Sequence, residues 1–289
     1  MKTGLVLEGG ALRTIFSGGV CDAMLESDLA VDYMVGVSAG VTYGASFISR
    51  QPRYSLEVVK RFARDRRYMG MNNLVNPKNQ SYFGLEFAYR TVPNELVPFD
   101  YDTFEAFPGL VEAVVTNLDT GEAEYMKLPG RGEEHTTLLQ ATCALPLMFP
   151  IYHINGTPYL DGGIADSIPY ERAFAQGCDQ VMVVLTKPRD YVRKTEALMP
   201  VIWKKYKEYP KFCQAMEERA EKYNACRDRL FQLEKEGKVL VIAPENTMGV
   251  SRTERDVEKL KLLWGHGYQM AVDRMDEIRA WLNGVQGND

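Results

Sequence analysis

Residues 33–42 decide the fold, and they read Tyr-Met-Val-Gly-Val-Ser-Ala-Gly-Val-Thr. The run is apolar up to Ser38, which stands between Gly36 and Gly40 in a Gly-x-Ser-x-Gly pattern. This pattern predicts a strand that turns within one residue into a helix, because a side chain at either glycine would collide with neighbouring backbone. The turn would expose the serine hydroxyl at the positive N-terminal end of the helix. Ser38 is therefore a candidate nucleophile on an elbow; the alternative is a tight turn with an incidental serine.

A glycine-rich loop follows the first predicted strand. Residues 4–8 form a buried apolar run, and residues 9–13 read Gly-Gly-Ala-Leu-Arg before a helical pattern that reaches about Leu25. The converging N–H groups of such a loop suit a bound phosphate and a developing oxyanion equally well. Neither a P-loop nor a dinucleotide-binding pattern can be laid on this segment. Gly9, Gly10 and Ala11 are therefore candidate oxyanion-hole residues, and a helix-opening turn without a ligand is the alternative.

A third segment carries a carboxylate at the end of a predicted strand. Residues 151–154 and 157–160 flank Asn155-Gly156, which is a strong hairpin signal. The second strand ends at Asp161, and Gly162 and Gly163 follow it. These glycines let the backbone veer away and leave the carboxylate approachable, although an Asp-Gly turn without a function is also common.

Taken in order, these segments resemble the patatin-like phospholipase family. That family has a strand, a glycine-rich oxyanion loop with a nearby basic residue, a Gly-x-Ser-x-Gly elbow and a distal Asp-Gly-Gly or Asp-Gly-Ala, and residues 141–150 also look like its helix end before the aspartate. The resemblance covers residues 4–186. It implies an acyl hydrolase that cleaves fatty-acyl esters of phospholipids or lysophospholipids through an acyl-serine. Ser38 would be the nucleophile, Asp161 the base, and Arg13 a side chain that stabilises nearby anionic charge.

The chain departs from the family pattern at two positions. Ala11 stands where the family usually has a third loop glycine, and Thr14 stands where a glycine usually follows the basic residue. Neither change removes a backbone N–H, so the hole can still form, in a tighter or less active site. For Arg13, the alternative is a surface residue on the first turn of a helix, where a cation is mildly disfavoured.

The three histidines decide between a dyad and a triad. His266 is the only one after Asp161, as the order Ser, acid, His requires, but residues 260–270 keep helical spacing on both sides of it. His135 and His153 precede Asp161. We therefore expect a Ser-Asp dyad without histidine.

A binding module is the alternative function. In that case the glycine loop and a basic segment would hold an anionic lipid head group without turnover, and the pairing of Ser38 with Asp161 argues against it. Residues alone do not distinguish phospholipid, lysophospholipid, neutral glyceride and thioester substrates.

Composition limits the class of protein. The 289 residues are 45% hydrophobic and 25% charged, which predicts one domain over residues 1–289, with core motifs in 4–186 and a helical region, 199–289, packed on them. A formal net charge of −5 argues against nucleic acid as a partner. Five scattered cysteines suit a reducing compartment, and the chain shows no signal-peptide or membrane-spanning run, so we expect a cytoplasmic location. No metal or organic cofactor is implied, and the sequence does not indicate an oligomeric state.

Two segments beside the motifs carry weaker signals. The segment of residues 49–79 carries seven basic residues between Arg50 and Arg67 on a helical pattern, which favours a solvated helix face over peripheral contact with an anionic membrane. Residues 72–99 show little periodicity, so we assign them no regular structure and expect a loop or cap over the site.

The alternation of strands and helices predicts a three-layer α/β/α fold. The central sheet should be mostly parallel, with the site at the C-terminal ends of its strands. Residues 200–237 are helical in pattern and broken by Pro210, with aromatic side chains that either pack on the core or form a lid. Residues 256–283 are expected to form a single amphipathic helix.

Overall fold

The computed structural model of the chain describes residues 1–284, and the last five residues of the predicted domain lie outside this part. Its central feature is one sheet of eight strands. The strands are β1 (Thr3–Leu7), β2 (Tyr33–Val37), β3 (Leu110–Asn117), β4 (Ala123–Lys127), β5 (Tyr152–Ile154), β6 (Thr157–Asp161), β7 (Gln180–Val184) and β8 (Val239–Ile242).

The sheet has a parallel centre and an antiparallel flank. Its order is β5-β6-β3-β2-β1-β7-β8, with β4 also paired to β3. The strands β3, β2, β1, β7 and β8 run parallel to one another, whereas β4 and β6 pair antiparallel with β3, and β5 pairs antiparallel with β6. The predicted, mostly parallel sheet is therefore confirmed.

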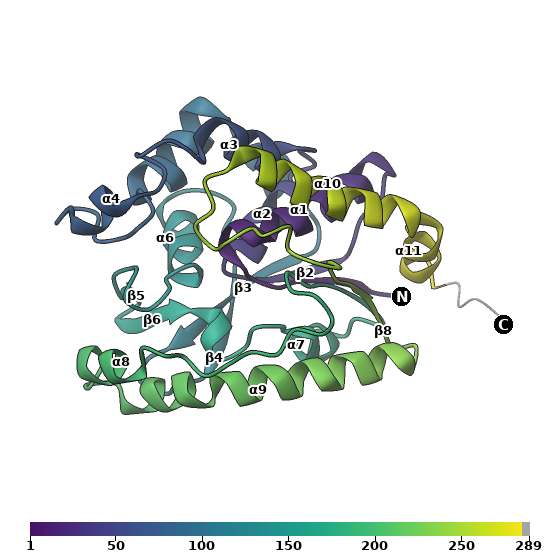
Figure 1. Cartoon of the computed structure of the whole chain (residues 1–289). Coiled ribbons are helices and arrows are strands. Elements are labelled where there is room, and N and C mark those ends of the chain that lie inside the picture. Colours follow the sequence, from purple (N-terminus) through teal and green to yellow (C-terminus); the bar gives the residue numbers. More distant parts are fainter. Residues whose placement is uncertain (285–289) are drawn as a thin grey trace.

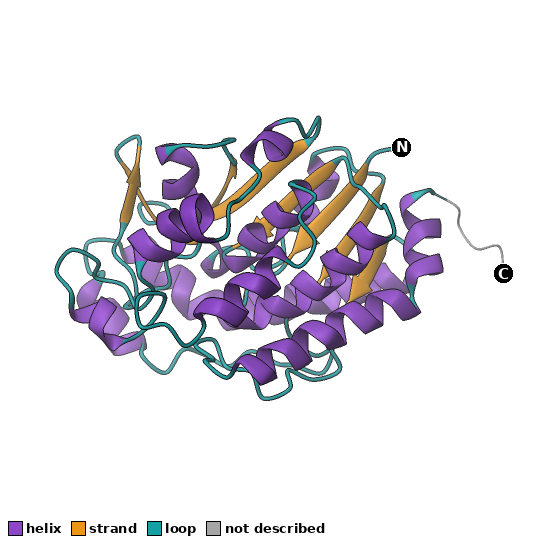
Figure 2. Ribbon diagram, turned by 90° about the horizontal axis from the view of Figure 1, so that it is seen from above, coloured by secondary structure: helices purple, strands orange, loops and turns teal. Residues whose placement is uncertain are grey.

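Helices cover both faces of the sheet, as predicted. Those with bounds are α1 (Ile15–Glu26), α2 (Ala39–Ile48), α3 (Tyr54–Phe62), α4 (Met71–Val75), α5 (Tyr101–Glu105), α6 (Glu133–Thr142), α7 (Tyr170–Ala175), α8 (Met199–Lys205), α9 (Pro210–Lys235), α10 (Val257–Asp273) and α11 (Met275–Leu282), and the 3₁₀ turns are η1 (Ala11–Thr14) and η3 (Gly162–Ile164). Figure 1 shows α9 along one side of the sheet and α1, α2 and α10 along the other. Seen from above, the strands lie side by side beneath helices (Figure 2).

Strand alternation explains the layers. Leu5 and Leu7 of β1 point into the core shared with α1, α2 and α10, while Val6 points into the core shared with α7 and α9. All three side chains are fully buried. Because successive side chains of a strand face opposite sides, apolar residues at every position indicate a sheet covered on both faces.

Two strands meet end to end along one edge of β3. Val37, the last residue of β2, pairs with Val114, and Asp161, the last residue of β6, pairs with Val115. The opposite edge of β3 is occupied by β4. Since β2 runs parallel and β6 antiparallel to β3, their chains approach from opposite directions and their ends become neighbours.

The prediction for residues 72–99 was wrong in part. This segment contains the short helix α4 and a π-helix, η2 (Phe87–Leu96), which includes Pro93. A π-helix has wider turns than the 3.6-residue period, so its apolar residues do not repeat at α-helical spacing. Pro93 also argued against a helix, because proline removes a backbone donor.

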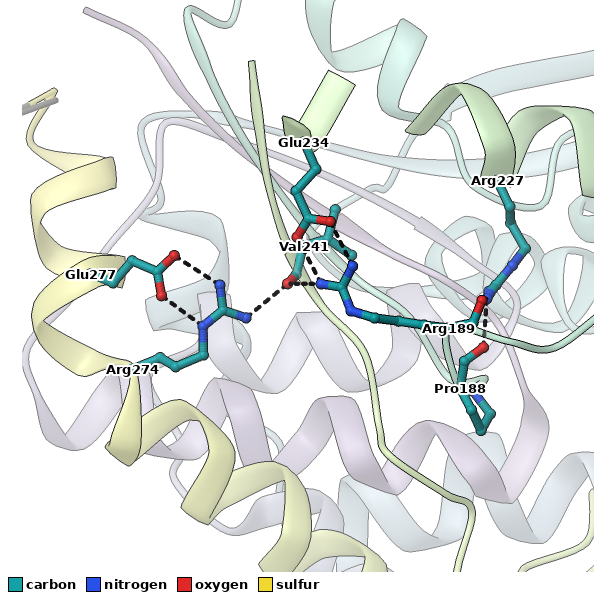
Figure 3. Close-up of polar contacts among 7 residues, drawn as sticks. All are labelled: Pro188, Arg189, Arg227, Glu234, Val241, Arg274 and Glu277. Carbon is teal, nitrogen blue, oxygen red and sulfur yellow. Dashed lines mark hydrogen bonds and ion pairs between the residues drawn. The ribbon is translucent and has the colours of Figure 1, made fainter. Parts of the chain in front are cut away.

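The C-terminal segment forms two helices where one was expected. α10 ends at Asp273 and α11 begins at Met275, with Arg274 between them. The Arg274 side chain donates to the Val241 carbonyl of β8 at 2.9 Å and also pairs with Glu277 (Figure 3). This contact fixes the bend against the sheet edge.

The basic segment is partly neutralised by nearby carboxylates. Ion pairs join Arg50 to Asp28, Arg53 to Glu26, Lys60 to Glu57 and Arg67 to Asp65.

Within residues 1–284, no helix is long and apolar enough to cross a bilayer.

Candidate active site

Ser38 lies at a strained elbow between β2 and α2. Its backbone φ is 55°, a left-handed conformation that costs a non-glycine residue about 1 kcal/mol or more. A side chain at Gly40 would place its Cβ 2.3 Å from the Leu7 carbonyl oxygen, which explains the second glycine of the motif. The Ser38 N–H donates to Thr142 Oγ1 at 2.9 Å, and the Thr142 hydroxyl donates to the Val114 carbonyl at 2.6 Å. Thr142 therefore holds the elbow to β3.

Asp161 lies beside the elbow with one carboxylate oxygen free. Its Oδ1 accepts from the Gly163 N–H at 2.8 Å, while Oδ2 is buried and has no hydrogen-bond partner within residues 1–284. Burial raises the pKa of Asp161, whereas Arg219 and the Ser38 hydroxyl lower it by smaller amounts. The side chain is 2% exposed. An unpartnered oxygen on a carboxylate of raised pKa is suited to accept a proton.

The glycine loop passes directly over Ser38. A Cβ on Gly9 would lie 2.9 Å from Ser38 Cβ and 2.6 Å from the Val37 carbonyl oxygen, so only glycine permits this approach. The N–H groups of Gly9, Gly10 and Ala11 make no hydrogen bond to other groups of the described chain. Ala11 has a φ of 50°, so it occupies the left-handed conformation that a glycine would adopt without strain.

A buried carboxylate supports this loop from behind. Glu8 accepts hydrogen bonds from the Thr186 N–H at 2.6 Å, the Thr186 hydroxyl at 3.0 Å and the Tyr223 hydroxyl at 2.5 Å. The Thr186 hydroxyl also lies 3.0 Å from the Gly9 carbonyl oxygen. The loop is thus fixed by the segment that follows β7 and by α9, a helix far away in the sequence.

Arg13 also reaches the site. It is partly buried, and its Nε is buried without a hydrogen-bond partner in the described chain. Burial lowers the pKa of Arg13, and nearby Arg252 lowers it further. The side chain lines the same cavity as Ser38 and Asp161. This position argues against the alternative that Arg13 is a solvent-facing surface residue.

Two cavities of opposite character meet at Ser38. A polar cavity is lined by Ser38, Asp161, the glycine loop and several basic side chains. An apolar cavity is lined by Ser38 and by aromatic and small residues such as Tyr43, Phe83 and Phe149. Ala11, Ser38 and Leu145 belong to both, so the serine lies on the boundary.

The three histidines lie elsewhere. His135 is buried on α6 with its Nδ1 2.7 Å from the Pro129 carbonyl oxygen, and burial lowers its pKa. His153 is exposed on β5. The Nε2 of His266 on α10 accepts from the Glu245 N–H at 3.2 Å. None of them lines either cavity at Ser38.

The sequence analysis missed several residues around Ser38. The positions of Glu8 and Thr186 in the sequence could have indicated a place at the site, because each lies within two residues of the end of a parallel strand, where sites in such sheets form. Thr142 had none, since its hydroxyl is one of many on a helical segment. Arg219 and Arg252 also line the polar cavity but belong to a region that we interpreted as scaffold.

The chain matches two family models. Residues 5–174 match the patatin-like phospholipase model, and residues 209–283 match a domain of unknown function, DUF6363. The first match contains the glycine loop, the elbow and the Asp-Gly-Gly segment. The second contains Arg219, Tyr223 and Arg252.

Curated relatives match over part of their length. The chain is 27% identical over 201 residues to the uncharacterized protein YjjU of Escherichia coli strain K12, covering 65% of this chain and 52% of that protein. It is 27% identical over 193 residues to lysophospholipase nte1 of Aspergillus niger, covering 63% of this chain and 12% of that protein. Among solved structures, VipD from Legionella pneumophila aligns with a TM-score of 0.47 and 14% identity, covering 96% of this chain and 67% of that one.

Thr142→Val tests the attachment of the elbow. The change removes the acceptor for the buried Ser38 N–H and the donor to Val114, so we expect the free energy of unfolding to fall by about 1–3 kcal/mol. If Ser38 is the nucleophile, its displacement should also lower kcat for ester hydrolysis by roughly 10-fold or more. Urea denaturation and ester turnover measure the two effects.

Thr137→Val is the matched control on the same helix, because the Thr137 hydroxyl makes a long 3.4 Å contact with Glu133 near the surface. Equal stability and turnover in the two variants would contradict a role for Thr142.

Proposed function

The chain belongs to the patatin-like phospholipase family, and on this premise we propose that it is a serine acyl hydrolase of phospholipids or lysophospholipids. Ser38 and Asp161 would act as a dyad through an acyl-serine intermediate. The observation that carries the proposal is the buried, unpartnered Oδ2 of Asp161 next to a serine whose backbone is held in a strained elbow.

The reaction would follow from the positions of these groups. Ser38 Oγ attacks the acyl carbonyl carbon while its proton passes to Asp161, and Asp161 returns the proton to the departing alcohol. Water then attacks the acyl-serine, gives its proton to Asp161, and the fatty acid leaves as Ser38 is reprotonated. A raised pKa makes Asp161 a stronger base than an ordinary carboxylate.

The free amides of the glycine loop would hold the oxyanion of each tetrahedral intermediate. A donor of this kind is typically worth about 3–4 kcal/mol in the barrier. The close approach of Gly9 to Ser38 supports this role, because the donors must lie beside the reacting carbonyl.

The apolar cavity is suited to the acyl chain. It shares Thr42, Tyr68, Ala88 and Tyr89 with a further apolar cavity that extends towards Val92 and Leu139. An acyl chain whose carbonyl lies at Ser38 can therefore continue from the first cavity into the second. Burial of its methylenes would supply binding energy remote from the reacting bond.

The two matched regions would act as one unit. Tyr223 of α9 bonds Glu8 beneath the glycine loop, and the Arg219 Nε donates to the Gly163 carbonyl at 2.7 Å. These contacts support the single-domain interpretation, since the C-terminal region reaches the site itself.

Delivery of substrate from a lipid surface is part of the same proposal. Met71 and Val75 of α4 are 63% and 73% exposed, close in sequence to Tyr68 of the apolar cavity. Four basic residues of the preceding segment, Arg50, Arg53, Lys60 and Arg67, are already ion-paired. The electrostatic attraction of this segment to an anionic membrane would therefore be weaker than its count of basic residues suggests.

The dyad predicts a specific pattern of variants. Ser38→Ala and Asp161→Asn should each abolish hydrolysis, while His135→Ala, His153→Ala and His266→Ala should each keep most of it. Purified proteins and a lysophospholipid substrate provide the measurement. Loss of activity in the folded His266→Ala protein, comparable to that in Ser38→Ala, would replace the dyad by a triad.

Measuring the free energy of unfolding distinguishes a loss of catalysis from a loss of folding in these variants. Because burial raises the pKa of Asp161, the folded state disfavours the charged carboxylate more than the unfolded chain does, and stability falls as pH rises through the raised pKa. At neutral pH, Asp161→Asn should therefore be at least as stable as the wild type. An Asp161→Asn protein that is inactive because it is unfolded would contradict the assignment of Asp161 as the base.

Acyl-chain selectivity tests the apolar channel. Ala88 lines both apolar cavities, so Ala88→Leu should narrow their junction and exclude the end of a long chain. Loss of two buried methylenes is worth about 1.6 kcal/mol, so the kcat/KM ratio of long-chain to short-chain esters should fall roughly 10-fold. Ala106→Leu on the exposed end of α5 is the control. An unchanged ratio in Ala88→Leu would place the acyl chain elsewhere.

A further inference from the structure

The polar cavity beside Ser38 contains a concentration of basic side chains from four parts of the chain. Arg13 comes from η1, Lys187 and Arg193 from the segment after β7, Arg219 from α9, and Arg252 from the segment before α10. Arg219 and Arg252 lie outside the residues that match the patatin-like model. The cluster is therefore assembled largely by parts of the chain that the family motifs do not include.

These five cations lack carboxylate partners. None of them forms an ion pair with any residue of the described chain. Two carboxylates line the cavity, but Glu8 is occupied by Thr186 and Tyr223, and Asp161 faces the nucleophile. The Nε atoms of Arg13 and Arg193 are buried without a hydrogen-bond partner in this part of the chain. The cavity thus has a surplus of positive charge and of free donors.

The like charges in this cavity disfavour one another. Burial, followed by the charge of Arg193, lowers the pKa of Arg219 to about 10. Burial, followed by the charge of Arg13, lowers the pKa of Lys187 to about 8. Charges that oppose one another in a partly desolvated cavity are stabilised when an anion binds between them.

The fold holds the cations in place despite this repulsion. Arg189 is ion-paired with Glu234 of α9 at 2.6 Å, and Arg227 of α9 donates to the Pro188 carbonyl at 2.5 Å (Figure 3). The Arg193 guanidinium lies 4.0 Å from the centre of the Tyr223 ring. The segment that carries Lys187 and Arg193 is therefore fixed to α9, which also carries Arg219.

The ligand chemistry follows from what lines the cavity. It contains no aromatic side chain and no unoccupied carboxylate other than the proposed base, so it offers nothing to a choline or ethanolamine cation. Arginine and lysine donors match phosphate oxygens well. Because the cavity adjoins the apolar one at Ser38, a lipid with its ester carbonyl at the serine would extend its head group into it.

We propose that this cavity is a subsite for a terminal phosphate monoester, and that the preferred substrate carries such a head group, as phosphatidic acid and lysophosphatidic acid do. The inference rests on the proposed acyl hydrolase function and adds its head-group specificity. The C-terminal region supplies this specificity through Arg219 and Arg252.

Matched lysolipids test the head-group preference. We expect wild-type kcat/KM for dodecanoyl-lysophosphatidic acid to exceed that for dodecanoyl-lysophosphatidylcholine by roughly 10-fold or more, both below their critical micelle concentrations. Lys187→Gln and Arg252→Gln should each reduce this ratio by roughly 10-fold, the worth of a lost charge-assisted hydrogen bond. Arg229→Gln, which removes an exposed ion pair with Glu236 on α9, should leave it unchanged. Equal use of the two lipids, or a ratio unaffected in both cavity variants, would overturn the inference.

A binding experiment tests the head-group subsite separately from the proposed hydrolase activity. Calorimetric titration of the Ser38→Ala protein with lysophosphatidic acid should show binding that Arg252→Gln weakens, whether or not the wild type turns over. Absence of turnover with binding intact would contradict the hydrolase and retain the subsite, whereas absence of binding would contradict the subsite. The same titration is repeated with inorganic phosphate. Phosphate that binds as tightly as the lipid would identify free phosphate as the ligand and overturn the head-group assignment.

Discussion

The head-to-head meeting of β2 and β6 along one edge of β3 is the constraint on which the site depends. Val37 and Asp161 pair with consecutive residues of β3, so the backbone ladder itself sets the distance between Ser38, which follows β2, and Asp161, which ends β6. Thr142 strengthens this junction by accepting from Ser38 and donating to Val114. Two residues more than a hundred positions apart are thereby held together by main-chain geometry and need no flexible side chain to meet.

The same junction divides the surroundings of Ser38 into an apolar and a cationic half. The apolar cavity is lined by residues of α2, η2 and the end of α6, while the cationic cavity takes side chains from the glycine loop, α9 and the segment before α10. A lipid ester has this division in its own structure, with an acyl chain on one side of the carbonyl and a head group on the other. On the proposed function, this correspondence would give the C-terminal region a role in substrate choice in addition to its packing on the sheet.

The sequence was sufficient for the parts of the site that depend on backbone conformation. Gly40 and Gly9 lie where any side chain would clash, and the hairpin signal at Asn155-Gly156 located the strand that ends in Asp161. The alternation of Leu5, Val6 and Leu7 between the cores on the two faces of the sheet corresponds to the predicted layers.

What the sequence did not predict depends on contacts between distant residues. Arg219 and Arg252 show no local pattern that distinguishes them from solvated arginines, because their role arises only when α9 and the segment before α10 fold over the glycine loop. The π-helix over residues 87–96 was missed for a different reason, since its turn length does not produce α-helical periodicity. The bend at Arg274 likewise depends on a carbonyl of β8 that lies across the fold.

Active-site labelling tests the central claim most directly, because only a serine activated beside a base and an oxyanion hole reacts rapidly with a fluorophosphonate. The wild-type protein should be labelled at one site, and peptide mapping should identify Ser38. Labelling should be lost in Asp161→Asn at unchanged stability and kept in His266→Ala. Labelling at another residue, or its absence from the folded wild-type protein, would contradict the dyad and favour a lipid-binding module.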